Sequence, residues 1–214
     1  MRRQAATKCK GPYIIGLTGN IATGKSLVAG ILNELGAEII DADKLAHEVV
    51  QPGTEVYRQV VSIFGKCVIR SDGEIDRVKL GQIVFADPEA MRRLEKVIHP
   101  AVIARVQEIL ATTKATVVVI EAIKLLETGM DSICDAIWVV TSPREVQVQR
   151  LMEERGLTQQ EAKLRIDAQP SQEEKILRAD VVIDNGGTIA ATRDQVSRLW
   201  AQIPVFERTR ERRR

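Results

Sequence analysis

A glycine-rich turn between two apolar segments restricts the fold of this chain more than any other feature. The segment YIIGLT, residues 13–18, is β-branched and apolar, as is typical of a strand that is buried on both faces. Residues 19–26 then follow the pattern G-x-x-x-x-G-K-S. Apolar residues at helical spacing come next and end at Gly36; they are Leu27, Val28, Ile31, Leu32 and Leu35. The sequence therefore predicts a strand, a tight turn and a helix in direct succession.

Strand-like and helical segments alternate along the rest of the chain. Four more apolar segments are typical of strands, at residues 37–40, 116–121, 136–141 and 180–184. Capping-box patterns at Ser142, Thr158 and Ser171 predict three helix starts between the last two of these strands. Alternation of this kind indicates a parallel sheet covered by helices.

The turn at residues 19–26 has the chemistry of a phosphate-binding loop. Glycine lets successive backbone N–H groups converge on an anion, and the helix that begins there adds its positive end. Lys25 reaches the β- and γ-phosphates of a nucleotide, and the Ser26 hydroxyl is a Mg²⁺ ligand. A chance match is the alternative, but the flanking strand and helix argue against it. We expect an α/β P-loop NTPase fold of three layers, with a mainly parallel sheet of about five strands.

The chain fits a compact kinase better than other nucleotide-binding classes. The guanine-reading patterns N-K-x-D and T-K-x-D of GTPases do not occur, and motor and transporter ATPases are longer than 214 residues. We predict a single kinase domain over residues 13–206. Its helical insertion at about 44–114 would bind the acceptor, and a lid at about 143–178 would exclude water from the site.

The charge distribution argues against a nucleic-acid partner. The net charge of +2 combines +4 on residues 1–10, +3 on residues 207–214 and −5 on residues 11–206. A nucleic-acid binder usually carries its basic surface on the folded body, so we read 1–12 as a disordered basic extension and 207–214 as a basic tail. No apolar run is long enough for a bilayer. We expect no membrane partner and a monomer or small homo-oligomer.

The three cysteines, Cys9, Cys67 and Cys134, are widely spaced and form no C-x-x-C pair. This spacing argues against a disulfide framework or a zinc site. It indicates a cytoplasmic location.

Two aspartates end the second predicted strand, at the sheet edge where open α/β folds bind ligands. A carboxylate at Asp41 or Asp43 is suited to accept a proton from an attacking hydroxyl. The alternative is that one or both cap the helix that starts near Lys44.

At this point the sequence resembles a known family. IIGLTGNIATGKS followed by GAEIIDADKLAHEVVQPG is similar to the dephospho-CoA kinase family. DGEIDRVKLGQIVF, LLETG, QRLMEERG and ADVVIDNGG extend the resemblance in one order from about residue 13 to 200. The resemblance implies transfer of the γ-phosphoryl group of ATP, with Mg²⁺, to the ribose 3′-hydroxyl of dephospho-CoA. That reaction is the last step of coenzyme A synthesis.

The resemblance also implies roles for individual residues. It makes Asp43 the base that faces the hydroxyl. It makes Asp41 a residue that either binds a metal-bound water or has a structural role. Arg150 matches a lid arginine whose forked donors suit the charge on the transferred group, the alternative being a solvated helix arginine. Asn185 matches a position near the ATP base, the alternative being a turn asparagine.

Two further residues match the family's acceptor-binding region. They are Arg77 and His99, and for His99 a position at a helix start is the alternative to substrate contact.

This chain departs from the family pattern within the phosphate loop. The usual G-G-I-G-S-G-K-S-T is replaced by the nine residues expected to hold ATP, which are Gly19, Asn20, Ile21, Ala22, Thr23, Gly24, Lys25, Ser26 and Leu27. Asn20 tolerates left-handed backbone geometry and Ala22 does not, so we predict a negative φ at Ala22.

A second departure lies at residues 120–129. Glu121 replaces an aspartate and is expected to hold a Mg²⁺-bound water. Lys124 replaces a leucine, and it either pairs with substrate phosphate, extends to solvent or pairs with Glu121.

Two other functions stay open. One is a kinase of another small nucleotide or hydroxyl compound, and the other is a nucleotide-binding regulator that acts through the basic ends.

Overall fold

The computed structural model describes residues 11–204 of the chain. Most of the expected basic extension and the whole expected tail at 207–214 lie outside the described residues. The described elements run in the order β1 (Tyr13–Thr18), α1 (Lys25–Glu34), β2 (Glu38–Asp41), α2 (Ala42–Glu48), α3 (Glu55–Phe64), η1 (Lys66–Val68), α4 (Arg77–Ala86), α5 (Pro88–Thr112), β3 (Val117–Glu121), η2 (Met130–Ile133), β4 (Ala136–Thr141), α6 (Arg144–Arg155), α7 (Gln159–Asp167), α8 (Gln172–Ile176), β5 (Val181–Asp184) and α9 (Ile189–Ala201).

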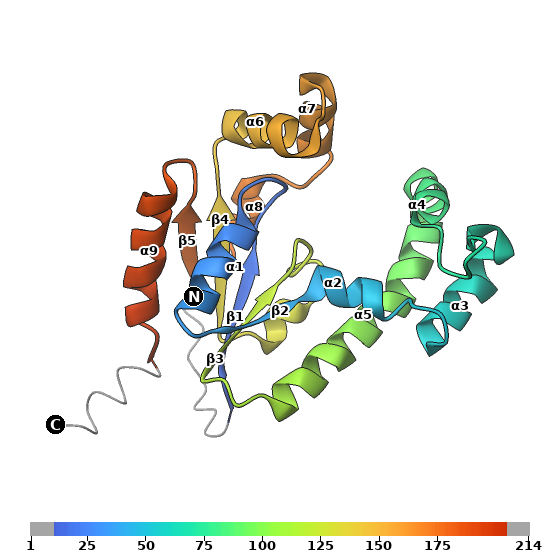
Figure 1. The fold of residues 1–214 in the computed structure, drawn as a ribbon, viewed down its shortest axis with the longest axis horizontal. Coiled ribbons are helices and arrows are strands. Elements are labelled where there is room, and N and C mark those ends of the chain that lie inside the picture. Colours follow the sequence, from blue (N-terminus) through green and yellow to red (C-terminus); the bar gives the residue numbers. More distant parts are fainter. Residues whose placement is uncertain (1–10, 205–214) are drawn as a thin grey trace. The chain divides into compact units, whose positions relative to one another are not determined.

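The chain divides into two compact units. The sheet unit combines the residues up to Ile40 with those from Thr113 onward, and the helical unit is Asp41–Thr112. Figure 1 labels the elements of both units along the sequence. Among the described residues, none of the helices combines the length and the apolar character that crossing a membrane requires.

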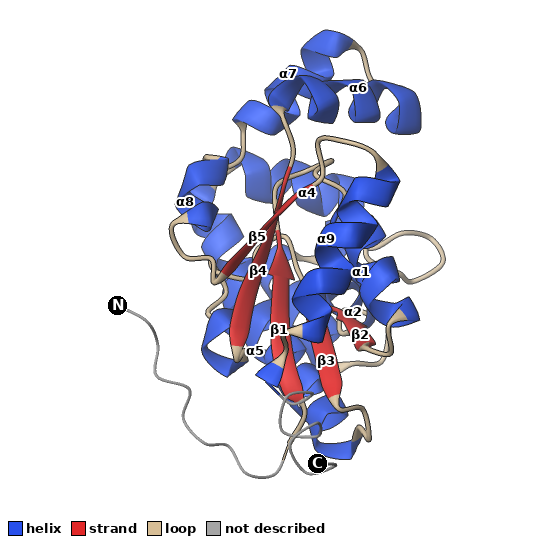
Figure 2. Cartoon of the chain, turned by 90° about the vertical axis from the view of Figure 1, so that its left-hand side faces the viewer, coloured by secondary structure: helices blue, strands red, loops and turns tan. Residues whose placement is uncertain are grey.

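The sheet unit contains the expected five-stranded sheet, in the order β2-β3-β1-β4-β5 (Figure 2). β1 pairs in parallel with β3 and with β4, and β4 pairs in parallel with β5. The predicted bounds of β1 and β4 match the structure. Those of β3 and β5 differ by one residue at the start, and β2 is shifted by one residue at both ends. β1, β3 and β4 are buried along almost their whole length. A strand that is buried on both faces is apolar throughout, and for this reason the continuous apolar segments identified these strands.

Helices α1 and α9 cover one face of this sheet. Alternate side chains of β1, β3 and β4 point into a shared core with the apolar stripes of the two helices. This core includes Ile15, Leu17, Val119, Trp138, Val28, Ile31, Leu32 and Val196. On the other face, Gly16 lets the segment that precedes β4 approach closely, since a Cβ there would lie 2.6 Å from Leu125 Cδ2 and 2.8 Å from Cys134 Sγ.

The three predicted helix starts between β4 and β5 all exist, but only one has a complete capping box. Thr158 accepts the N–H of Glu161, and the Glu161 carboxylate accepts the N–H of Thr158. Ser171 precedes α8 without a side-chain cap. The box predicted at Ser142 is wrong, because α6 begins one residue later, after Pro143. The ring of Pro143 fixes its φ near the helical value, and α6 starts after it without a capping side chain.

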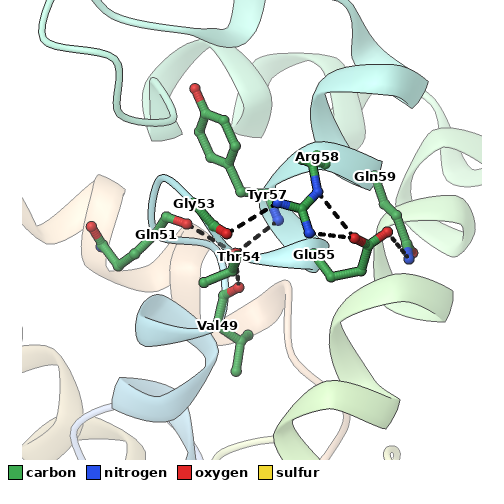
Figure 3. Close-up of polar contacts among 8 residues, drawn as sticks. All are labelled: Val49, Gln51, Gly53, Thr54, Glu55, Tyr57, Arg58 and Gln59. Atoms are coloured by element: carbon green, nitrogen blue, oxygen red, sulfur yellow. Dashed lines mark hydrogen bonds and ion pairs between the residues drawn. The ribbon is translucent and has the colours of Figure 1, made fainter.

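In the helical unit, a turn around Thr54 starts α3 (Figure 3). The Thr54 hydroxyl lies 2.7 Å from the carbonyl oxygen of Val49 and 2.9 Å from that of Gln51, and it accepts the N–H of Tyr57. Arg58 donates to Glu55 and to the carbonyl of Gly53. Helix α3, which this turn starts, contributes Val60 to a separate hydrophobic core. The other buried members of that core are Val68, Ile75, Leu80, Val84 and Ala90.

The alternative that His99 lies at a helix start is wrong, and Pro100, which follows it, does not interrupt the helix. Both residues lie inside α5, a single helix from Pro88 to Thr112. Proline in a helix removes one backbone hydrogen bond and costs about 3 kcal/mol. Buried side chains on both sides of Pro100, those of Ala90, Val102 and Val106, outweigh this cost.

Candidate active site

The carboxyl ends of the parallel strands bring the expected nucleotide-binding residues of the sheet unit to one edge. Residues 19–24 follow β1, and Glu121 ends β3. Ser142 follows β4 and Asn185 follows β5. Open α/β sheets bind their ligands at this edge.

Two glycines of the loop cannot be replaced without strain. Gly19 has φ 158°, and a Cβ there would lie 2.4 Å from the carbonyl oxygen of Val140. Gly24 is left-handed, with φ 86° and ψ 33°, and a Cβ there would lie 2.0 Å from Asn185 Nδ2. Between them, the Thr23 hydroxyl donates to the Asn20 carbonyl at 2.9 Å and closes the turn. The sequence motif therefore forms a tight loop at the start of α1.

The predicted negative φ at Ala22 is wrong. Ala22 has φ 57° and is the one non-glycine residue of the described chain with a positive φ. This geometry costs about 1–2 kcal/mol for alanine. Two contacts offset it: the Ala22 carbonyl accepts Arg150 Nη1 at 3.1 Å, and Ile21 and Ala22 pack against the apolar cluster of α6 and α7. Asn20, the residue expected to tolerate a left-handed backbone, does not adopt one.

Lys25 and Ser26 begin helix α1 where the loop ends. Lys25 is 9% exposed, and the Ser26 hydroxyl donates to Glu121 Oε1 at 3.2 Å. The two expected metal-binding residues are thus neighbours. The described residues contain no cluster of three His, Cys, Asp or Glu side chains suited to a metal. A hydroxyl beside one carboxylate fits Mg²⁺, which is usually held by one or two protein oxygens together with phosphate oxygens.

Arg150 of α6 connects the loop to the end of β5. Its Nη1 donates to the Ala22 carbonyl, and its Nη2 donates to the Asn185 carbonyl at 2.7 Å. The alternative of a solvated helix arginine is therefore wrong. Two fixed carbonyls orient the guanidinium plane beside the loop, as suits recognition of phosphate.

Asn185 is 1% exposed, and both ends of its amide bond to the protein. Nδ2 donates to the Thr23 carbonyl at 2.8 Å, and Oδ1 accepts the Thr192 hydroxyl at 2.8 Å. The side chain thus holds the phosphate loop against α9.

A cavity of about 410 Å³ opens beside these residues. Its lining combines the loop, the start of α1, α6 and the residues after β5; it comprises Ala22, Gly24, Lys25, Ser26, Leu27, Arg150, Glu154, Arg155, Asn185 and Ile189. A larger cavity of about 680 Å³ lies between Thr141–Arg144 and the segment from Ile166 to Glu173. Of the residues expected to bind ATP, only Asn20 lines the larger cavity, so the smaller one suits the nucleotide better.

Sequence reasoning missed three polar residues whose hydrogen bonds lie next to the site. Gln169 accepts the N–H of Ile21 at 2.7 Å, and Thr192 supports Asn185. Lys175 is buried in α8 and donates to the carbonyl of Ile123 at 2.6 Å. Thr192 and Lys175 lie in helices and Gln169 lies between α7 and α8, and no local pattern indicates the partner of any of them.

The other expected residues have the following positions. Asp41 caps α2 by accepting the N–H of Lys44 at 2.8 Å, so the capping alternative is confirmed for Asp41. Asp43 lies in the first turn of the same helix. Arg77 is the exposed first residue of α4, and His99 lies within α5, both in the helical unit. Lys124 is exposed on the loop that follows β3 in the sheet unit.

Beside Arg77, the pKa of Asp76 is lowered from its ordinary value. The largest cause is the backbone N–H of Lys79, which Asp76 accepts as the N-cap of α4.

The matching family model and the curated relatives name the same family. The family model described as dephospho-CoA kinase matches residues 13–191. The dephospho-CoA kinase of Moorella thermoacetica is 44% identical over 195 residues, which cover 89% of this chain and 92% of that protein.

Two solved structures are similar to this chain, and one of them is a dephospho-CoA kinase. The crystal structure of TT1252 from Thermus thermophilus has a TM-score of 0.80 at 34% identity and covers 91% of this chain and 99% of its own. The dephospho-CoA kinase from Campylobacter jejuni has a TM-score of 0.65 at 31% identity, with 88% and 96% covered. With the nucleotide loop in place at the sheet edge, these matches show that the chain belongs to the dephospho-CoA kinase family.

Proposed function

We propose that this chain holds ATP in the cavity beside residues 19–27 and directs its γ-phosphoryl group to the ribose 3′-hydroxyl of dephospho-CoA. As a member of its family, the chain is an ATP-dependent kinase that catalyses the final step of coenzyme A synthesis. The observation that carries the proposed site is the assembly of the loop, the Ser26–Glu121 pair and Arg150 at one sheet edge. We place this activity in the cytoplasm, on the basis of the cysteine usage.

The sheet unit supplies the groups that act on phosphate. Lys25 and the loop N–H groups bind the phosphates, and Arg150 neutralises charge that spreads over the transferred group. Asn185, which supports the loop, lies between it and α9. Residues 143–178, with helices α6, α7 and α8, form the lid that excludes water, because an open site would let water accept the phosphoryl group.

Ser26 and Glu121 are the residues that would hold Mg²⁺. The ion, when bound, neutralises phosphate charge and orients the β- and γ-phosphates. The 3.2 Å distance between Glu121 Oε1 and the Ser26 hydroxyl supports this proposal.

The helical unit supplies the groups that act on the acceptor. Asp43, in the first turn of α2, is the base that accepts the proton of the 3′-hydroxyl as the oxygen attacks phosphorus. Arg77 and His99 bind the acceptor, and Lys124 of the sheet unit adds a cation for its phosphates. Asp41 accepts the N–H of Lys44 and so has the structural role of capping α2.

The test is an ATP-consumption assay with dephospho-CoA, adenosine, AMP and shikimate as acceptors. We expect turnover with dephospho-CoA and a loss of about 10²-fold or more in kcat for Asp43→Asn, with little change in the KM for ATP. Asp41→Asn is the matched control, because asparagine also caps helices and should leave kcat nearly unchanged. Turnover of another acceptor in place of dephospho-CoA would overturn the proposal.

A further inference from the structure

A buried cation lies close to the site but outside the machinery described above. Lys175 of α8 is 3% exposed. Its Nζ donates to the carbonyl of Ile123 at 2.6 Å and to Glu127 Oε1 at 3.2 Å. Burying an ammonium group is unfavourable, and an apolar side chain of similar volume often gives equal or higher stability. Stability alone therefore does not account for a lysine here.

The carbonyl that Lys175 binds is shared with the strand that precedes the phosphate loop. Ile123 O also accepts the Thr18 hydroxyl at 3.1 Å. Thr18 is the last residue of β1, directly before the loop, and Ile123 follows Glu121 by two residues. One carbonyl oxygen thus joins the ends of β1 and β3 to α8.

This junction restrains the backbone next to Glu121. The N–H of Ala122, the residue after Glu121, donates to the Leu17 carbonyl at 3.1 Å. The Ile123 carbonyl is held on its other side by Lys175 and Thr18. The backbone on the carboxyl side of Glu121 is therefore fixed at successive residues, and the Glu121 carboxylate lies beside the Ser26 hydroxyl.

We propose that Lys175 is a positioning residue, which orients Glu121 toward Ser26 by fixing the carbonyl of Ile123. This inference rests on the proposed function, in which those two oxygens hold Mg²⁺. Lys175 itself touches neither ATP nor the acceptor in this account. Its charge strengthens a hydrogen bond to a neutral carbonyl, which a neutral side chain would hold less firmly.

Three other substitutions are useful for comparison, because each changes a neighbouring contact and keeps Lys175. Arg178, just after α8, donates to Asp131 Oδ2 at 2.8 Å and so anchors the same segment without touching Ile123. Glu127→Gln removes the paired charge but leaves the lysine-to-carbonyl bond available. Thr18→Val removes the second donor to the Ile123 carbonyl with almost no change in shape.

The first measurement is calorimetric titration of ATP with and without Mg²⁺ into Lys175→Met, Thr18→Val, Arg178→Met and Glu127→Gln. For Lys175→Met we expect the gain in ATP affinity due to Mg²⁺ to fall at least fivefold relative to wild type. Thr18→Val should show a smaller loss in the same direction. Arg178→Met and Glu127→Gln should keep the wild-type gain, even if their unfolding midpoints fall.

Hydrogen–deuterium exchange of the nucleotide-free protein is the second measurement. Lys175→Met should speed exchange at residues 117–127 at least threefold, and Arg178→Met should leave that segment unchanged.

An unchanged Mg²⁺ gain in both Lys175→Met and Thr18→Val would overturn the inference. Equal losses in Lys175→Met and Arg178→Met would also overturn it, because they would mark a general structural role. If Lys175→Met does not fold, Thr18→Val decides the question. Wild-type inactivity on dephospho-CoA would instead contradict the proposed function.

Discussion

Asn185→Ala should destabilise the protein and weaken ATP binding at the same time. The substitution removes two buried hydrogen bonds, one to the Thr23 carbonyl and one from the Thr192 hydroxyl. Thr23 is fully buried, so its carbonyl would be left without that partner, at a cost of about 1–3 kcal/mol. The Thr192 hydroxyl can turn to the Thr188 carbonyl at 3.4 Å, which limits its loss to about 1 kcal/mol. The expected loss in the free energy of unfolding is therefore about 2–4 kcal/mol.

Chemical denaturation and thermal melting measure this loss directly. For a chain of this size, the loss corresponds to a fall in Tm of roughly 5–15 °C. ATP affinity should also fall, because the Thr23–Gly24 peptide is no longer held in the loop. Thr192→Val is the comparison, since it removes only one of the two bonds and should cost about 1 kcal/mol. A loss below about 0.5 kcal/mol for Asn185→Ala, or a larger loss for Thr192→Val, would refute this account.

Three further predictions concern the loop, α6 and α4. Ala22→Val should lower the free energy of unfolding by about 1–3 kcal/mol in urea titrations, because a β-branched residue is strained at φ 57°, whereas Ala22→Gly should stay within about 1 kcal/mol of wild type. Arg150→Lys should lower kcat at least tenfold in steady-state assays, because one ammonium cannot reproduce two forked donors to Ala22 and Asn185. The lowered pKa of Asp76 means that its contribution to stability is fully present above its unfolded pKa of about 3.9 and is lost as the pH falls below that value. The stability difference between wild type and Asp76→Ala should therefore shrink below about pH 4, and a difference that grows on acidification would contradict the assignment.

The elements that were predicted correctly are those whose structure depends mainly on residues close together in the sequence. A strand buried on both faces has to be apolar throughout, so β1 and β4 were located to the residue. The phosphate loop was found because the glycines at 19 and 24 occupy positions where a Cβ would meet other atoms. Thr158 with Glu161 marked a helix start because both partners of the capping box are local.

Two of the wrong predictions, those at Ala22 and at His99-Pro100, and the missed residue Lys175 share a different cause. The φ of Ala22 is set by contacts with α6 and α7, more than a hundred residues away in sequence. Pro100 interrupts a helix by local rules, but burial on both sides of it keeps α5 continuous. The role of Lys175 depends on a carbonyl 52 residues away. In each case the deciding partner is distant along the chain, so no window of local sequence contains it.

The α6 and α7 helices lie next to each other in both views of the molecule (Figures 1 and 2). Val148 and Leu151 of α6 pack on Ala162 of α7, and Arg144, at the start of the pair, donates to both carboxylate oxygens of Asp167, at its end. Because its two ends are joined, the pair should swing as one rigid body, and the pivots should be the connections that flank residues 144–167. Two fluorophores attached within that range would then keep a constant separation as nucleotide binds, and any change in distance would be seen only between that range and the strands of the sheet.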